Sequence, residues 1–168
     1  AGKYPVESVE TMATIAAIAE QNIWHNRQQQ FSIRNFEISG GNEAIADSIS
    51  EATYHISEAL NPRAIVTTTL TGYTARRVAR ERPRTPILCV TPSEITYRRM
   101  ALVWGVVPLL IPTFSTIDEM ISIISRAAVG EALVKKGDMV IIIAGVPFGV
   151  GGQTNLLKIH RIGEDSEI

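Results

Sequence analysis

Residues 64–80, AIVTTTLTGYTARRVAR, decide the fold of this chain. An apolar run, Ala64–Val66, is followed by the turn Thr67–Thr74, which holds five threonines and one glycine in eight residues. A helix-like segment, Ala75–Arg80, comes directly after the turn. This order predicts a buried strand that leads through the turn into a helix beginning near Gly72, the first βα unit of a parallel sheet.

The threonine-rich turn also has the chemistry of an anion site. The first backbone N–H groups of a helix have no partner within the helix, and they point outward at its N-terminus. Threonine hydroxyls add further donors, and Gly72 lets a phosphate oxygen approach the backbone. The turn therefore predicts the binding of a phosphorylated small molecule.

The rest of the chain repeats the alternation of short apolar runs with amphipathic helices. The first four runs lack strict alternation, which is typical of parallel strands covered on both faces. A glycine-rich loop too short for a crossover helix precedes the fifth run, so that strand is expected to be antiparallel. The predicted fold is a three-layer α/β/α domain with a five-stranded mixed sheet. The five runs are Ala64–Val66, Ile87–Val90, Val106–Ile111, Met139–Ala144 and Leu156–Ile162.

Two helical stretches come before the first strand. Apolar residues at three- and four-residue steps predict a long helix from Pro5 to about Gln30, with the proline in its first turn. Residues 31–41 end in Ser-Gly-Gly and are interpreted as a linker. A second helix is expected from Asn42 to Leu60, where Asn61-Pro62 stops it. The main domain is therefore placed at residues 42–168.

Two later helices have capping patterns. Thr91-Pro92-Ser93-Glu94 is interpreted as a capping box with Pro92 at the first helical position. Ser115–Asp118 repeats the pattern. Ser93 and Ser115 are therefore expected to be caps or first-turn residues rather than nucleophiles.

Composition excludes several classes of partner. A formal net charge of −1 provides no field that would attract nucleic acid or an anionic membrane. The arginine clusters lie on predicted helices without interleaved aromatic residues and are interpreted as solvated faces. No apolar run approaches the roughly 20 residues that span a bilayer. The single cysteine, Cys89, lies in an apolar run and forms no disulfide within the chain. A cytoplasmic location is expected.

A second loop is expected at the same edge of the sheet as the threonine turn. Residues 145–155, after the fourth strand, contain four glycines. Carboxyl ends of parallel strands form the ligand-binding edge of such sheets, so this loop could fold over a ligand. The glycines could equally only shape a wide β-hairpin. The chain lacks GxGxxG and a P-loop motif, so neither nucleotide-binding motif is supported.

The residues indicate a site for binding and none for catalysis. His25, His55 and His160 are scattered and have no clustered cysteine or carboxylate partners, so no metal ligands are assigned. No acid–base pair or nucleophile with a base emerges. No catalytic residue is therefore assigned.

Several segments resemble the pyruvate kinase family, in order and over nearly the whole chain. Gly2–Met12 resembles the start of the last helix of the catalytic barrel in that family. The other similar segments are Arg80–Ile87 with Val90-Thr91, Ala101–Val106, Lys136–Asp138, Ala144–Pro147 and Thr154–Leu156.

The resemblance implies a C-terminal regulatory domain of bacterial type, with residues 1–30 as the terminal barrel helix. Members of the family transfer phosphate from phosphoenolpyruvate to ADP with Mg²⁺ and usually K⁺, on residues of the barrel. The resemblance thus implies that this chain alone is inactive and holds no cofactor. It also implies contacts with its own barrel and a homo-oligomer in the parent protein.

By resemblance, the effector-phosphate loop falls on Thr69–Thr74 and the flexible sugar-side loop on Gly145–Gln153. Many relatives have Arg or Lys where this chain has Tyr73, and Arg76 and Arg77 could compensate. Relatives activated by fructose 1,6-bisphosphate have Trp and Arg on the segment matching Thr113–Met120, which has neither. The second phosphate of that sugar therefore has no cationic partner. Val103–Gly105 and Ala144–Pro147 are more similar to bacterial enzymes that respond to AMP or to sugar monophosphates such as ribose 5-phosphate, so the resemblance favours these effectors. The assigned residues are Thr69, Leu70, Thr71, Gly72, Tyr73, Thr74, Gly149, Gly151 and Gly152.

Two alternatives remain open at this point. The chain could be a stand-alone enzyme or binding module for a phosphorylated small molecule, although it lacks an acid–base pair. It could also serve chiefly as an interaction surface, because the terminal strand Leu156–Ile162 has an open edge that a second copy could pair with.

Overall fold

The computed structural model describes residues 2–29, 41–149 and 153–164. The chain divides into two compact units, residues 1–37 and residues 38–168. The first unit contains helix α1, Pro5–Gln29, which begins at the proline as predicted. Most of the predicted linker lies outside the described residues. The second unit contains the sheet and all other elements.

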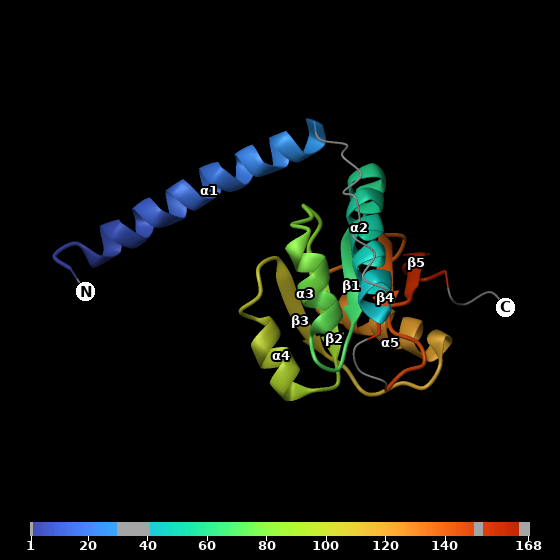
Figure 1. The fold of residues 1–168 in the computed structure, drawn as a ribbon. Coiled ribbons are helices and arrows are strands. Elements are labelled where there is room, and N and C mark those ends of the chain that lie inside the picture. The colour runs from blue at the N-terminus through green and yellow to red at the C-terminus, as the bar shows by residue number, and fades with distance from the viewer. Residues whose placement is uncertain (1, 30–40, 150–152, 165–168) are drawn as a thin grey trace. The chain divides into compact units, whose positions relative to one another are not determined.

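Helices and strands alternate along the second unit as far as β4, and β5 is the next element after it (Figure 1). The sheet order is β3-β2-β1-β4-β5. In chain order the elements are α2 (Asn42–Leu60), β1 (Ala64–Thr68), α3 (Tyr73–Arg80), β2 (Ile87–Thr91), α4 (Glu94–Met100), β3 (Val106–Leu110), α5 (Ile117–Gly130), β4 (Met139–Ala144) and β5 (Leu156–Arg161).

The predicted mixed sheet is confirmed. Strands β1, β2, β3 and β4 pair in parallel, whereas β5 pairs antiparallel with β4. The physical reason is the one expected from the sequence: a parallel return needs a crossover of a dozen or more residues, usually a helix. Residues 145–155 are too few to supply that crossover.

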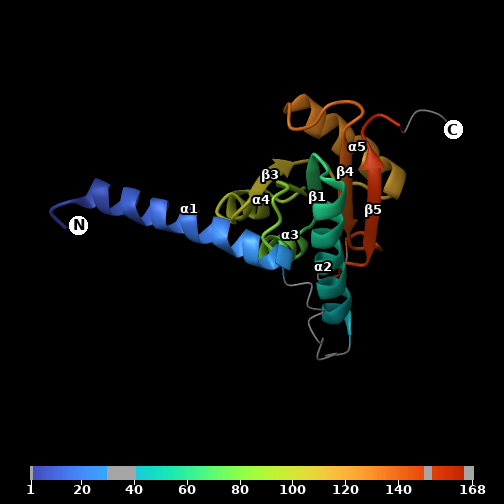
Figure 2. The same cartoon turned by 90° about the horizontal axis from the view of Figure 1, so that it is seen from above.

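The predicted three layers are also present. One core cluster joins one face of the sheet to α5, and it includes Val66, Ile142 and Ile124. The other joins the opposite face to α2, α3 and α4, and it includes Ile65 and Met100. Figure 2 shows α5 on one side of the sheet and α2 and α3 on the other. Strands β1, β2 and β4 are therefore covered on both faces.

Strand β3 departs from the prediction that each of the first four strands is central. It lies at the edge of the sheet, and its Val107 and Leu110 are 40% and 46% exposed. Pro108 lies within it and cannot donate to a further strand, as is typical of edge strands. Apolar composition alone did not distinguish this edge strand from a buried one.

Two strand and helix boundaries also differ from the predictions. Strand β1 continues through Thr67 and Thr68, both buried, so these residues belong to the sheet rather than to the turn. Helix α4 begins at Glu94, after the N-cap Ser93, whose Oγ accepts from the N–H of Thr96. Pro92 thus precedes the cap and is not the first helical residue.

Helix α5 begins with a capping arrangement close to the one that the second pattern predicted. Its N-cap is Thr116, whose Oγ1 accepts from the Glu119 N–H at 3.2 Å. The Glu119 carboxylate in turn accepts from the Ser115 N–H at 2.8 Å. The predicted box is therefore displaced by one residue: Thr116 and Glu119 take the places expected of Ser115 and Asp118, and the carboxylate bonds the residue before the cap.

Cys89 is fully buried in β2. Burial raises the pKa of its thiol to about 11, although the hydrogen bond with Thr67 and the charge of Arg76 act in the opposite direction. A thiol with this pKa stays neutral near pH 7 and is a weak nucleophile. This agrees with the prediction of a buried core residue.

Candidate functional site

A cavity of about 440 Å³ opens at the carboxyl edge of the sheet. Strand order places β1 beside β4, and the connections from these two parallel strands lead to opposite sides of the sheet. Ligands of such sheets bind at this topological switch point. Segments after β1, β3 and β4 meet there. The cavity is lined by Thr68, Thr69, Leu70, Thr71, Tyr73, Thr74, Val90, Pro92, Thr113, Phe114, Ser115, Gly145, Pro147, Phe148, Gly149 and Gln153.

The threonine turn forms one wall, and hydrogen bonds hold it. The Gly72 N–H donates to Thr69 Oγ1 at 3.0 Å, and Thr96 Oγ1 of α4 donates to the Leu70 carbonyl at 2.6 Å. Arg76 Nη1 donates to the Thr71 carbonyl at 3.2 Å. The shape of the turn is therefore set before any ligand arrives.

The N-terminus of α3 lies at this wall. Gly72 is the N-cap with φ 83°, and the first intrahelical bond runs from the Arg76 N–H to the Gly72 carbonyl. The N–H groups of Tyr73, Thr74 and Ala75 therefore have no acceptor within the helix. Together with the helix dipole they favour an anion here.

The glycine-rich loop forms the opposite wall. The Asn155 side chain accepts from the Val146 N–H at 2.8 Å and donates to the Val146 carbonyl at 2.6 Å, which ties the exit of the loop to its entry. Phe148 contacts Phe114 edge to face, with ring centroids 4.8 Å apart. This contact joins the loop after β4 to the segment after β3.

Most of the assigned site residues lie together at the cavity. Six line it directly: Thr69, Leu70, Thr71, Tyr73, Thr74 and Gly149. Gly72 is not among the lining residues, and a Cβ at this position would lie 2.7 Å from the Met100 side chain. Gly151 and Gly152 lie outside the described residues.

Several lining residues were not assigned from the sequence. Phe114 and Ser115 are the main ones, whereas Phe148 lies within the sugar-side loop assigned by resemblance. Phe114 and Ser115 follow β3, so the rule that ligands bind at carboxyl ends of strands pointed to them as well. The aromatic contact of Phe114 with Phe148 depends on strand order, which the sequence did not provide.

The remaining titratable residues supply no metal site in the part of the chain that the structure describes. It holds no group of three His, Cys, Asp or Glu side chains that could bind a metal ion. His55 lies 3.9 Å from Glu51 on α2, and His160 is buried in β5. No described helix is both long and apolar enough to cross a membrane.

A buried hydroxyl pair links the two walls. Thr74 Oγ1 and Thr154 Oγ1 lie 2.9 Å apart, and each residue is 2% exposed. Thr154→Val is expected to lower the free energy of unfolding by about 1–3 kcal/mol, because Thr74 then loses this buried partner. Urea unfolding measures the change. Thr113→Val, at an exposed hydroxyl, should change it by less than about 0.5 kcal/mol; equal losses would contradict the linking role.

Comparison with known proteins agrees with this architecture. The family described as "Pyruvate kinase, alpha/beta domain" matches residues 47–160. A pyruvate kinase of Geobacillus stearothermophilus is 43% identical over 164 residues, which are 98% of this chain and 27% of that protein. One of Clostridium acetobutylicum is 42% identical over 163 residues, 96% of this chain and 33% of that protein.

A pyruvate kinase of Methylorubrum extorquens is 38% identical over 159 residues, 95% of this chain and 32% of that protein. The chain thus spans about a third or less of the length of these relatives. The residues matched by the family include β1 to β4 completely and β5 up to His160. The chain belongs to the pyruvate kinase alpha/beta domain family.

Proposed function

We propose that this chain is a regulatory and subunit-interface domain of a pyruvate kinase, and that a phosphorylated effector binds in the cavity at the switch point. The observation that carries the proposal is the position of the α3 N-terminus at the wall of a cavity of about 440 Å³. Ligand cavities commonly have volumes of roughly 300–1,000 Å³.

The phosphate would bind at the start of α3. The backbone N–H groups of Tyr73 and Thr74 and the hydroxyl of Thr71 supply donors at the same wall. Arg76 lies beside the turn, on the Thr71 carbonyl, and adds a positive charge. This set of donors favours a single phosphate group.

The rest of the cavity favours a ligand whose part beyond the phosphate group is uncharged. None of the described lining residues is Lys, Arg, Asp, Glu or His. The side away from the turn carries Phe114, Phe148 and Pro147, with Ser115 and Gln153 as polar groups. A second phosphate would lack a cationic partner there. AMP or a sugar monophosphate is therefore favoured over fructose 1,6-bisphosphate.

In this proposal the chemistry belongs to another part of the parent protein. The transfer of phosphate from phosphoenolpyruvate to ADP, with its Mg²⁺ and K⁺, is placed on the catalytic barrel, and this chain alone has no turnover. The open edge of β5 is proposed as part of a homo-oligomeric interface, where Ile159 is 46% exposed. An effector shifts such an assembly only if it binds the two states with different affinities.

Thermal unfolding of this chain with AMP, ribose 5-phosphate or fructose 1,6-bisphosphate tests the proposal. A ligand at 100 times its dissociation constant adds about 2.7 kcal/mol to stability. AMP or ribose 5-phosphate is expected to raise the Tm more than the bisphosphate at equal concentration. The buffer should contain no sulfate or phosphate, since either anion would compete.

A matched pair of variants controls this experiment. Thr71→Asp places a negative charge in the turn and should abolish the rise in Tm, whereas Thr71→Asn, of nearly equal size, should retain most of it. No rise in Tm with either monophosphate in the unsubstituted chain would refute effector binding.

A further inference from the structure

Arg77 lies on the face of α3 that also carries two residues of the cavity wall. It follows Thr74 by three residues and Tyr73 by four, and both of these line the cavity. Residues three and four apart lie on the same face of a helix, and helical side chains lean toward the N-terminus. The Arg77 side chain therefore starts on the same face as these two residues and extends toward the N-terminal end of α3.

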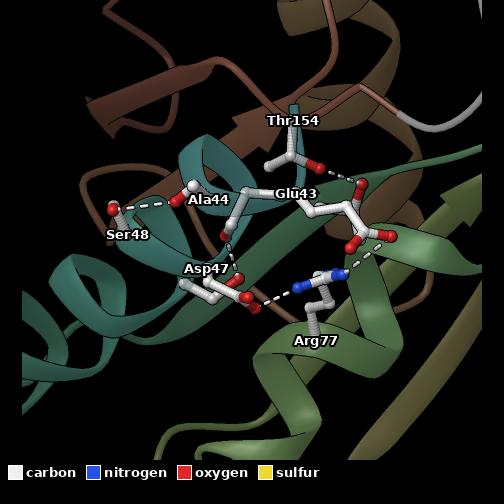
Figure 3. Close-up of polar contacts among 9 residues, drawn as sticks. Glu43, Ala44, Asp47, Ser48, Arg77 and Thr154 are labelled. Carbon is white, nitrogen blue, oxygen red and sulfur yellow. Dashed lines mark hydrogen bonds and ion pairs between the residues drawn. The ribbon is translucent and has the colours of Figure 1, made fainter. Parts of the chain in front are cut away.

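Carboxylates of α2 hold this guanidinium. Arg77 Nη1 bonds to Asp47 Oδ1, and Nη2 lies 3.9 Å from Glu43 Oε1 (Figure 3). Its Cζ also lies 4.6 Å from the centre of the Tyr73 ring, and the side chain is only 14% exposed. Burial by itself would lower the pKa of Arg77, but the hydrogen bond and charge of Asp47 raise it above its ordinary value.

Tyr73 therefore belongs to two contacts at once. One side chain both lines the cavity and stacks on a cation that is neutralised from α2. Arg76, in contrast, bonds to the turn itself and is exposed. Of the two neighbouring arginines, only Arg77 has its charge compensated by carboxylates of another helix in the contacts described here.

We propose that Arg77 can leave Asp47 and contact the anion in the cavity, and we call it the reserve cation of the site. Asp47 and the anion then compete for its guanidinium. Asp47 and Arg77 then determine the affinity of the site, although neither lines it. This inference rests on the proposed function, since it concerns the same cavity. It also gives binding a consequence outside the cavity, because an anion that attracts Arg77 weakens the contact between α3 and α2.

Electrostatics supports the direction of the effect. Arginine binds phosphate and carboxylate with the same planar donors, so the two anions compete for one group. A phosphate monoester carries up to two negative charges near pH 7, whereas Asp47 carries one. Removing the charge of Asp47 leaves Glu43, at 3.9 Å, as the remaining one of the two carboxylates that contact Arg77. Affinity for the anion should therefore rise.

Asp47→Asn tests the proposal by calorimetric titration with inorganic phosphate and with AMP. The dissociation constants are expected to fall at least fivefold relative to the unsubstituted chain. Glu51→Gln is the matched control: it removes one negative charge from α2 one turn later, where Glu51 lies 3.9 Å from His55 instead of contacting Arg77. Its effect should stay below twofold. Equal effects of the two variants, or no effect of Asp47→Asn, would overturn the proposal.

A second substitution separates the use of Arg77 from a general change of charge. In the Asp47→Asn background, Arg77→Gln should abolish the gain in affinity for the anion. Arg80→Gln, which also removes an arginine of α3, should leave that gain unchanged. A gain that survives Arg77→Gln overturns the proposal. If Asp47→Asn fails to fold, as judged by circular dichroism, Glu43→Gln replaces it. Glu43→Gln should raise the affinity for the anion by a smaller factor, and an unchanged affinity would count against the proposal.

These outcomes also distinguish this inference from the proposed function. If the unsubstituted chain binds AMP but Asp47→Asn binds it equally, the effector site stands and the reserve role of Arg77 is wrong. If neither protein binds AMP or phosphate, both proposals are wrong. Binding by Asp47→Asn alone would support the reserve role and indicate that Asp47 masks the site.

Discussion

Ile141→Ala is expected to lower the free energy of unfolding by about 2–5 kcal/mol, which is a large share of the 5–15 kcal/mol that stabilises a typical domain. Ile141 lies in β4, between β1 and β5, and is fully buried in the core cluster shared with α2 and α3. The substitution leaves a cavity that neighbouring strands cannot close. Urea unfolding followed by circular dichroism measures the loss.

A control for this substitution lies in the neighbouring strand, at the residue that pairs with Ile141. Ile159 of β5 is the register partner of Ile141 but is 46% exposed. Ile159→Ala in the monomer should cost less than about 1 kcal/mol, because less apolar surface is lost and no closed cavity forms. Equal losses at the two positions would contradict the placement of β4 inside the sheet and β5 at its edge.

Gly145→Ala is expected to weaken AMP binding at least tenfold and to lower the free energy of unfolding by about 1–3 kcal/mol. A Cβ at Gly145 would lie 2.2 Å from the Gln153 carbonyl oxygen and 2.9 Å from its carbon, both backbone atoms. The two ends of the glycine-rich loop would have to separate. The bonds between Asn155 and Val146 would then weaken, and the wall that carries Phe148 would shift.

Calorimetric titration with AMP and urea unfolding measure the two effects of Gly145→Ala separately. Gly130→Ala is the control, since a Cβ at the last residue of α5 meets nothing within 4 Å. It should leave the affinity unchanged and the stability unchanged or slightly higher. Unaltered AMP affinity in Gly145→Ala would mean that the loop does not shape the site.

The order of the elements could be predicted because it depends on local patterns. The alternation of apolar runs and amphipathic helices gave every strand of the sheet, and the short connection before Leu156 gave the antiparallel pair with β4. The edge position of β3 could not be predicted in this way. Its Val106–Leu110 run is as apolar as a central strand, and strand order depends on contacts distant in sequence.

The candidate site was predictable in part for the same reason. The threonine turn and the loop from Gly145 follow strands, and parallel strands bring their carboxyl ends to one edge. The pair Phe114–Phe148 and the bond between Thr74 and Thr154 join segments that lie far apart in the chain. No local pattern contains these contacts.

Arg77 shows most clearly which features the sequence determines and which only the tertiary structure determines. The sequence by itself determined the helix that carries this arginine, the hydroxyl-rich turn before it, and the absence of a basic residue at Tyr73. Only the tertiary structure decided that Arg77 pairs with Asp47 and stacks on Tyr73, because α2 and α3 meet across the face of the sheet. Helix propensity and periodicity act over a few residues, whereas the partner of a charge is set by packing between elements.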